Sequence, residues 1–210
     1  MTQNFKYGIV ITGLIASGKS TAIKILVEQG YSVICADCIA HEMLDKKAEQ
    51  IAKIFGLDLL EKNNEKTKIK REKLAKIVFS DEIARKKLEE ILHPLIYEKI
   101  ITQAKILEKE KRLYFIDIPL FFESSKKYNF KVALIYAPKS LALTRLMARN
   151  NLTKSEALMR INAQMDIEQK KLLSDFVIDN SADFENLKRN LNSFLKEINP
   201  FSDDCGTSLN

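Results

Sequence analysis

The sequence has 210 residues, of which 46% are hydrophobic and 30% charged, which is ordinary for a globular protein with a sizeable core. It contains no apolar run of the roughly 18–20 residues that span a bilayer, and residues 1–14 lack the cleavage site of a signal peptide, so we expect a cytoplasmic protein. The net charge of +6 fits either a lysine-rich proteome or an anionic partner, and charge alone does not choose between them.

The first predicted elements are an apolar strand over 7–12 and an amphipathic helix over 19–30. Between them, Gly13-Leu-Ile-Ala-Ser-Gly18-Lys19-Ser20 matches G-x-x-x-x-G-K-[ST] in full. In this context the motif predicts a P-loop, whose backbone N–H groups bind the phosphates of ATP or GTP. Lys19 is expected at the β- and γ-phosphates, and the Ser20 hydroxyl at Mg²⁺. The nucleotide contacts expected along this loop are Gly13, Ala16, Ser17, Gly18, Lys19, Ser20 and Thr21.

A second apolar strand, 31–36, runs into Cys35-Ala-Asp37-Cys38. The chain has three cysteines, and an odd number without a signal peptide argues against a disulfide framework. A zinc site would need further ligands, and a thioredoxin-like C-x-x-C motif should open a helix and usually has a proline or glycine inside it. We therefore expect two buried or semi-buried thiols at a strand end, with a metal or redox role as the alternative. Asp37 follows a strand at the carboxyl edge of the sheet, where a kinase requires a carboxylate for the acceptor hydroxyl. The alternative role of Asp37 is a helix N-cap, and both can hold together.

The interval 38–110 contains no convincing strand and predicts an inserted helical lobe. Helices are expected over 38–45, 47–56, 71–79 and 81–111. Pro94 should kink or divide the last of these helices. The lysine-rich stretch 61–73 is interpreted as a solvated loop.

Three more apolar strands, over 112–118, 131–137 and 175–180, alternate with helices over 141–150, 154–173 and 184–198. This order predicts an α/β fold: a P-loop, doubly wound, parallel five-stranded sheet with an inserted α-helical substrate lobe and a helical lid. The expected core is 5–37 with 111–198, the lobe 38–110 and the lid 145–173. Residues 199–210 lack periodicity and are expected to form a disordered tail.

Other candidate site residues lie in this second half of the chain. Asp117 ends its strand, either as a turn residue or with a role near Mg²⁺. Arg145 and Arg149 are four residues apart on one helical face, which suits a lid over ATP and also an ordinary solvated surface.

In its order of segments, the chain resembles the dephospho-CoA kinase family over residues 8 to about 195. The segments that carry the resemblance are "VICADCIAHE" (33–42), "REKLAKIVF" (71–79), "LEEILHPLI" (88–96), "IDIPLFFE" (116–123) and "SDFVIDN" (174–180). The resemblance implies ATP-dependent phosphorylation of the ribose 3′-hydroxyl of dephospho-CoA, which gives CoA and ADP in the last step of coenzyme A biosynthesis.

The same resemblance assigns roles to individual residues. It implies that Asp37 orients or deprotonates the acceptor hydroxyl and that Lys19 and Arg145 act on the transferred phosphate, with Arg149 in the lid. The residues implied on the acceptor side are Asp37, Arg71, His93, Pro94, Pro119 and Leu120. The implied cofactors are ATP and Mg²⁺, and the implied partner is dephospho-CoA, with neither nucleic acid nor membrane, on a monomer or weak homo-oligomer.

The chain also departs from the family pattern. Leu14 and Ala16 replace two loop glycines, Cys35 replaces an aspartate, and Lys170 stands where an arginine is common. Another P-loop small-molecule kinase, of the nucleoside monophosphate type, is the nearest alternative. A nucleotide-binding switch protein is a further alternative, although the N-K-x-D motif for guanine is absent.

Overall fold

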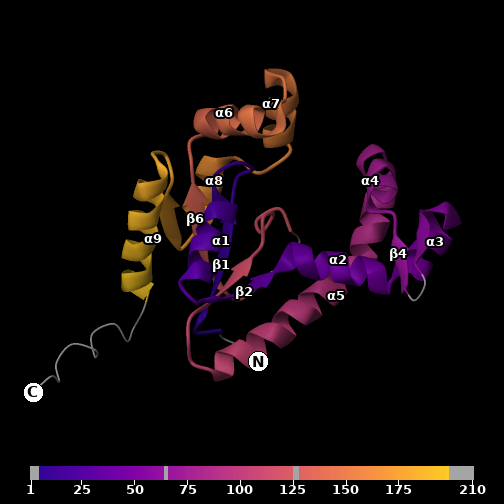
Figure 1. Cartoon of the computed structure of the whole chain (residues 1–210), viewed down its shortest axis with the longest axis horizontal. Coiled ribbons are helices and arrows are strands. Elements are labelled where there is room, and N and C mark those ends of the chain that lie inside the picture. The colour runs from indigo at the N-terminus through magenta and orange to yellow at the C-terminus, as the bar shows by residue number, and fades with distance from the viewer. Residues whose placement is uncertain (1–4, 64–65, 125–127, 199–210) are drawn as a thin grey trace, which may run out of the picture. The chain divides into compact units, whose positions relative to one another are not determined.

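The computed structural model describes residues 5–63, 66–124 and 128–198 (Figure 1). The tail expected over 199–210 lies outside the described residues. The chain divides into two compact units, each with its own contacts. The first comprises Met1–Ile34 and Leu107–Asn210, and the second comprises Cys35–Ile106.

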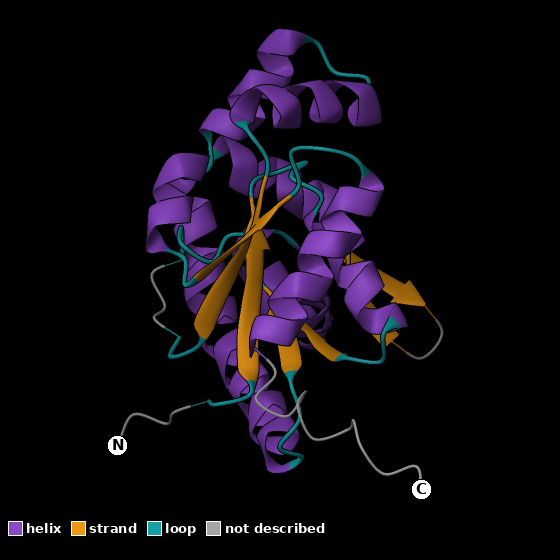
Figure 2. Ribbon diagram, turned by 90° about the vertical axis from the view of Figure 1, so that its left-hand side faces the viewer, coloured by secondary structure: helices purple, strands orange, loops and turns teal. Residues whose placement is uncertain are grey.

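The first unit is built on a five-stranded sheet, which confirms the predicted α/β fold. The five strands, each within one of the apolar runs or one residue beyond it, are β1 (Gly8–Gly13), β2 (Ser32–Cys35), β5 (Tyr114–Asp117), β6 (Lys131–Tyr136) and β7 (Phe176–Asp179). Their order is β2-β5-β1-β6-β7, and β1 pairs parallel with both β5 and β6. Figure 2 shows the strands as a twisted sheet among helices. β1 is buried along its whole length, which is why its sequence is continuously apolar.

Alternate residues of each strand point to opposite faces of the sheet, and each face has its own helices. On one face, Ile9, Ile11 and Ile135 pack with α1 (Lys19–Glu28) and α9 (Phe184–Ile198). On the other face, Leu134 packs with three helices of the lid region. These helices are α6 (Lys139–Asn150), α7 (Lys154–Asn162) and α8 (Ile167–Leu173).

The lid region differs from the sequence prediction in one respect. The helix expected over 154–173 is two helices, α7 and α8, separated by residues 163–166. The break has a local cause, because the Asp166 carboxylate accepts from the Glu168 N–H at 2.9 Å and starts a new helix as its N-cap.

The second unit contains mostly helices. They are α2 (Ala36–Lys46), α3 (Ala48–Phe55), the 3₁₀ turn η1 (Leu57–Leu59), α4 (Arg71–Ser80) and α5 (Glu82–Lys109), whose last turn belongs to the first unit. Of the two effects expected of Pro94, division of the last helix is wrong, since α5 continues through Pro94. A kink at Pro94 stays a prediction. Proline lacks an N–H, so α5 forgoes one backbone hydrogen bond at this position.

The second unit also contains a hairpin that the sequence analysis missed. Strands β3 (Leu60–Asn63) and β4 (Lys66–Ile69) pair antiparallel, with Leu60 opposite Ile69. The prediction of a strand-free lobe is therefore wrong, as is the solvated loop over 61–73. The apolar signal was weak because Leu60 and Ile69 are the only apolar residues of the two strands.

Within the part of the chain that the structure describes, no helix is long and apolar enough to cross a membrane.

Candidate active site

The P-loop connects the end of the central strand β1 to the first turn of α1. Two of its residues have left-handed backbone conformations: Ala16 at φ 63° and Gly18 at φ 95°. The Ser17 N–H donates to the Leu14 carbonyl at 3.0 Å, which closes a tight turn. Alanine is uncommon in the left-handed region, where its Cβ causes strain. Ala16 adopts this conformation nevertheless, so the turn is kept at a cost that a glycine would not carry.

Two glycines are required here by close approach. A Cβ at Gly13 would lie 2.5 Å from Ser17 Oγ, and a Cβ at Gly18 would overlap Asn180 Nδ2. Ser17 Oγ is itself buried and has no hydrogen-bond partner among the described residues. An unpaired buried hydroxyl inside a turn of N–H groups is the kind of donor that a phosphate oxygen satisfies.

Asn180, directly after β7, holds the backbone of the loop by a hydrogen bond. The sequence did not predict it as a site residue. Its side-chain Nδ2 donates to the Ser17 carbonyl at 2.7 Å, and its own N–H donates to the Tyr136 carbonyl at 2.7 Å. Asn180 is only 5% exposed. Asparagine after a strand usually indicates a turn. Apart from its place in "SDFVIDN", the sequence therefore gives no sign that Asn180 belongs to the site.

Lys19 lies at the start of α1, and its ammonium group donates to the carboxylate of Asp117. Asp117 ends β5, the strand next to β1, where it is paired in register with Ile11. The two side chains are only 14% and 17% exposed, so the charges are paired in a largely desolvated position. The structure therefore brings together the P-loop lysine and an acidic residue whose role the sequence left open.

The oxygen donors in this region fit Mg²⁺ held jointly with a nucleotide. Ser20 is exposed at the first turn of α1, next to Lys19, and the Asp117 carboxylate lies against Lys19. The described residues include no cluster of three or more His, Cys, Asp or Glu side chains that could hold a metal. Mg²⁺ normally keeps several waters and binds through one or two protein oxygens plus substrate phosphates, so a hydroxyl and one carboxylate are sufficient.

A second group of contacts ties the lid region to the P-loop. The Ile15 N–H donates to Gln164 Oε1 at 2.9 Å. Lys170 is completely buried, with its Nζ 2.8 Å from Glu123 Oε1 and 3.5 Å from the Gly13 carbonyl. Glu123 Oε1 also accepts from the Met165 N–H at 3.0 Å. A buried ammonium group is costly unless it is paired, so this ion pair fixes α8 beside the end of β1.

The remaining residues expected to contact nucleotide lie on α1 and α6. Thr21 is exposed in the first turn of α1. Arg145 donates to the carbonyls of Asn180 and Ala182, at 3.0 and 3.1 Å, and is thereby anchored to the loop that carries Asn180. Arg149 is exposed, and its Nε donates to Asn150 Oδ1 at 2.9 Å.

Asp37 lies in the second unit, exposed in the first turn of α2. The suggestion that it is the N-cap is wrong, since Cys35 occupies that position and its Sγ accepts from the Cys38 N–H at 3.1 Å. The expectation of two free thiols is also wrong, because the structure joins Cys35 and Cys38 in a disulfide. The sequence could not decide this, because the sulfurs meet only through the side-chain directions at the start of α2.

The residues implied on the acceptor side divide between the two units. Arg71, at the start of α4, pairs with Asp45 of α2 at 2.8 Å, on the same helix as Asp37. His93 is half-buried and Pro94 exposed in α5. Pro119 and Leu120 follow β5 in the first unit, where the Pro119 carbonyl accepts from Thr12 Oγ1 at 3.1 Å.

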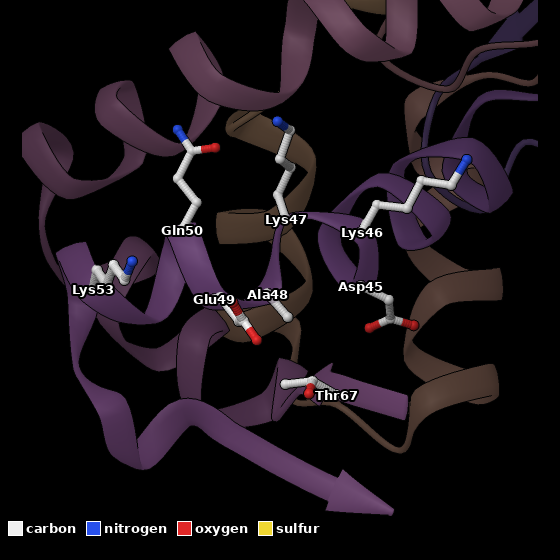
Figure 3. A pocket seen from close by; sticks show the side chains of 8 residues that line it. All are labelled: Asp45, Lys46, Lys47, Ala48, Glu49, Gln50, Lys53 and Thr67. Atoms are coloured by element: carbon white, nitrogen blue, oxygen red, sulfur yellow. The ribbon is translucent and has the colours of Figure 1, made fainter. Parts of the chain in front are cut away.

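A hollow of about 420 Å³ lies in the second unit at the junction of α2 and α3. Its lining consists of Asp45, Lys46, Lys47, Ala48, Glu49, Gln50, Lys53 and Thr67. Figure 3 shows the ammonium groups of Lys46 and Lys47 pointing away from the carboxylates of Asp45 and Glu49. Because these polar ends diverge, the hollow has no convergent set of ligand-binding groups.

Comparison with known proteins decides the family. The family model described as dephospho-CoA kinase matches residues 7–186. The chain belongs to the dephospho-CoA kinase family. It is 46% identical to the dephospho-CoA kinase of Helicobacter pylori over 196 residues, which cover 92% of this chain and 98% of that protein.

Solved structures agree with this family assignment. A dephospho-CoA kinase structure from Campylobacter jejuni is 41% identical, has a TM-score of 0.74, and matches over 91% of this chain and 96% of that one. A shikimate kinase from Acinetobacter baumannii, at 15% identity and a TM-score of 0.51, matches over 91% and 92% of the two chains. The second likeness concerns the fold alone, so the P-loop kinase architecture is shared beyond the family.

Proposed function

We propose that this dephospho-CoA kinase family member transfers the γ-phosphate of MgATP to the ribose 3′-hydroxyl of dephospho-CoA, giving CoA and ADP. The observation that carries the proposal is a complete P-loop, with Lys19 paired to Asp117, in a chain that matches the family over residues 7–186. In this reaction the 3′-oxygen forms a bond to the γ-phosphorus, and the bond to the oxygen bridging the β- and γ-phosphates breaks.

The residues of the first unit would bind and polarise the phosphates. The loop N–H groups and the positive end of α1 face the anion, and the Ser17 hydroxyl supplies a further donor. When the nucleotide binds, the Lys19 ammonium group would leave the Asp117 carboxylate and bind the β- and γ-phosphate oxygens instead. Ser20 and Asp117 are the oxygen donors assigned to Mg²⁺, which neutralises phosphate charge when bound.

The acceptor is assigned to a carboxylate of the second unit. Asp37 would orient the 3′-hydroxyl and take its proton as the new bond forms. Arg71, His93, Pro94, Pro119 and Leu120 are proposed to hold the rest of dephospho-CoA. Arg145 and Arg149 are proposed to act on ATP, with Arg145 directed by its bonds to the carbonyls of Asn180 and Ala182.

The acceptor assignment is tested by measuring ADP release from MgATP with dephospho-CoA, AMP, CMP, UMP and shikimate in parallel. We expect turnover with dephospho-CoA alone. Turnover with a nucleoside monophosphate would keep the P-loop assignment and overturn the acceptor. Nucleotide binding without turnover on any acceptor would favour a switch protein.

The role of Asp37 is tested separately with Asp37→Asn. The amide keeps the size of the side chain and cannot take a proton, so kcat should fall at least 100-fold, the scale of general-base catalysis, with little change in the Kd of ATP. Glu42→Gln is the matched control, because Glu42 is an exposed carboxylate on the same helix that pairs only with Lys46 among the described contacts. Equal loss in both variants would mean that Asp37 has no special role.

A further inference from the structure

Cys35 and Cys38 lie on either side of Asp37 at the beginning of α2, and their sulfurs are joined. Their Cα atoms are 5.2 Å apart, within the range of about 4.4–6.8 Å that a disulfide requires. The backbone of the first turn of α2 therefore closes into a ring that contains Ala36 and Asp37. No other described residue pair forms a disulfide.

The position of Cys35 gives this ring a structural role. Cys35 is the N-cap of α2, in an extended conformation at φ −97° and ψ 108°, and its sulfur accepts from the Cys38 N–H at 3.1 Å. Sulfur is a weak acceptor, and the strong N-caps are Ser, Thr, Asp and Asn. With the sulfur alone as acceptor, the first turn of α2 is poorly capped. The disulfide joins the N-cap residue Cys35 to Cys38, the third residue of the helix. It therefore stabilises the first turn, which the weak hydrogen bond to sulfur leaves poorly capped.

Both cysteines are at least partly exposed, whereas two residues beside them are buried. Cys38 is exposed and Cys35 half-buried, whereas Ile34 and Ile39 are only 3% and 4% exposed. A disulfide between accessible cysteines can be opened and closed by thiol exchange. Ala36, inside the ring, is itself buried at 9% exposure, so the ring also bears on a residue of the core. Cys35 is also the first residue of the second unit, so the ring closes directly where the chain enters that unit.

We propose that Cys35 and Cys38 form a reversible thiol–disulfide site that orders the first turn of α2 and so positions Asp37. The proposal rests on the proposed role of Asp37. The oxidant is a small-molecule disulfide such as glutathione disulfide. It accepts two electrons and the two thiol protons and leaves as two thiols, while Cys35 and Cys38 lose the two hydrogens and form the ring.

The expected consequence is a difference in turnover between the two states. In the oxidised protein the ring restricts the backbone around Asp37 to its helical conformation. In the reduced protein only the weak sulfur cap remains, and the turn opens more often. A full helix cap changes such a local equilibrium by about fivefold, so kcat of the oxidised form should exceed that of the reduced form by about fivefold.

The test compares the full chain treated with glutathione disulfide with the same chain treated with excess dithiothreitol. Intact mass and peptide mapping report whether two hydrogens are lost at 35–38. We expect a higher kcat after oxidation, an unchanged Kd for ATP, and slower amide hydrogen exchange over 36–40. Failure of the bond to form, or its formation without a change in kcat and exchange, overturns the proposal.

Two substitutions separate the bond from the cap. Cys38→Ser keeps the Cys35 sulfur and cannot pair, so it should resemble the reduced protein under both treatments. Cys35→Ser supplies a stronger cap without the bond, so it should approach the oxidised protein and be insensitive to oxidant. If Cys38→Ser still responds to oxidant, the effect arises elsewhere and the proposal fails.

A third variant distinguishes the failure of this proposal from the failure of the role given to Asp37. In Asp37→Asn the disulfide should form as in the wild type, and exchange over 36–40 should still slow on oxidation. If those changes occur while Asp37→Asn retains full turnover, the thiol–disulfide site stands and the catalytic assignment of Asp37 is wrong. If exchange over 36–40 does not change with redox state, the ring does not order α2.

Discussion

Gly18 is the position where the P-loop comes closest to its support. Its φ of 95° suits glycine, and Asn180 lies where a side chain would begin. The loop is thus shaped from two sides, by its own backbone conformation and by the side-chain amide of Asn180, which follows β7 far along the sequence. Both constraints bear on the N–H groups that are assigned to phosphate.

We predict that Gly18→Ala abolishes measurable ATP binding, because the added Cβ displaces Asn180 and moves the Ser17 carbonyl. Gly30→Ala is the matched control, since Gly30 has a similar φ of 85° and no atom within 4 Å of an added Cβ. Both variants carry the strain of a left-handed alanine, roughly 1–2 kcal/mol. Calorimetric titration with MgATP should therefore separate them, and comparable ATP affinity in both would contradict the role given to Asn180.

The buried ion pair offers a second test on single side chains. We predict that Lys170→Met lowers the free energy of unfolding by about 3 kcal/mol, because Glu123 loses its partner in a largely buried position. The KM for ATP should also rise, since Lys170 reaches the carbonyl of Gly13 at the P-loop. Urea unfolding and steady-state kinetics measure the two effects.

Lys171→Met is the control for that substitution. Lys171 is exposed, and its ammonium group lies 4.6 Å from the centre of the Tyr136 ring, a contact that contributes about 0.5–1 kcal/mol. Lys170→Arg keeps the charge and should recover most of the loss. An equal effect of the two methionine substitutions would show that the buried pair does not hold the loop.

At the scale of elements, the lid helix α7 depends on its capping box. Thr153 Oγ1 accepts from the Glu156 N–H at 3.3 Å, and Glu156 Oε2 accepts from the Thr153 N–H at 2.8 Å. We predict that Thr153→Ala lowers stability by about 1 kcal/mol, the usual contribution of an N-cap. Hydrogen exchange should increase in α7 first, and loss of protection throughout the sheet instead would contradict a local role.

The same capping box makes the stability of α7 depend on pH. The hydrogen bond from the Thr153 hydroxyl, followed by that from the Thr153 N–H, lowers the pKa of Glu156 below its usual value of 4.5. The folded state therefore favours the carboxylate, and its contribution is present above pH 4.5 and lost as the pH falls through the lowered pKa. The free energy of unfolding of the wild type should exceed that of Glu156→Gln above this acidic window, and the difference should disappear as the pH falls through it. A difference in stability that stays constant as the pH falls would contradict this.

The elements themselves differ in how far the sequence determines them. β1 and β6 were predictable because strands buried on both faces have continuously apolar sequences. The β3–β4 hairpin was not, because its two strands are polar apart from Leu60 and Ile69, which lie opposite each other. The separation of α7 from α8 could have been found from Asp166, which is a strong N-cap inside a pattern that otherwise continues.

The site shows the same limit for individual residues. The P-loop residues were predictable, since a contiguous motif carries its own geometry. Asn180 and Lys170 were not, since each contacts the loop across a long stretch of chain. Glu123 was not either, since among the described contacts it acts on the loop only through its ion pair with Lys170. The Lys19–Asp117 pair lies between these cases. The sequence predicted that Asp117 ends a strand at the carboxyl edge of the sheet, but not that this strand, β5, lies next to β1.

At the scale of the whole molecule, the net charge of +6 suits two anionic substrates. We predict that kcat/KM for dephospho-CoA falls as ionic strength rises from about 0.02 to 0.3 M, because added ions shorten the range of the attraction. The kcat at saturation should change much less. Matched additions of sucrose control for viscosity, and a kcat/KM independent of salt would mean that the overall charge does not guide the substrates.

The strand order β2-β5-β1-β6-β7 also bears on how the chain reaches its native state during synthesis. β1 and β2 are made first, yet β5 lies between them in the sheet, and β5 is Tyr114–Asp117. The first two strands thus have no neighbour to pair with until the whole of Cys35–Ile106 has left the ribosome. The contacts of the central sheet are long-range, which slows its assembly, whereas the helices and the hairpin of the second unit make local contacts. The second unit is therefore expected to be a nascent chain's earliest ordered part, with the phosphate-binding loop completed only after translation has passed β5.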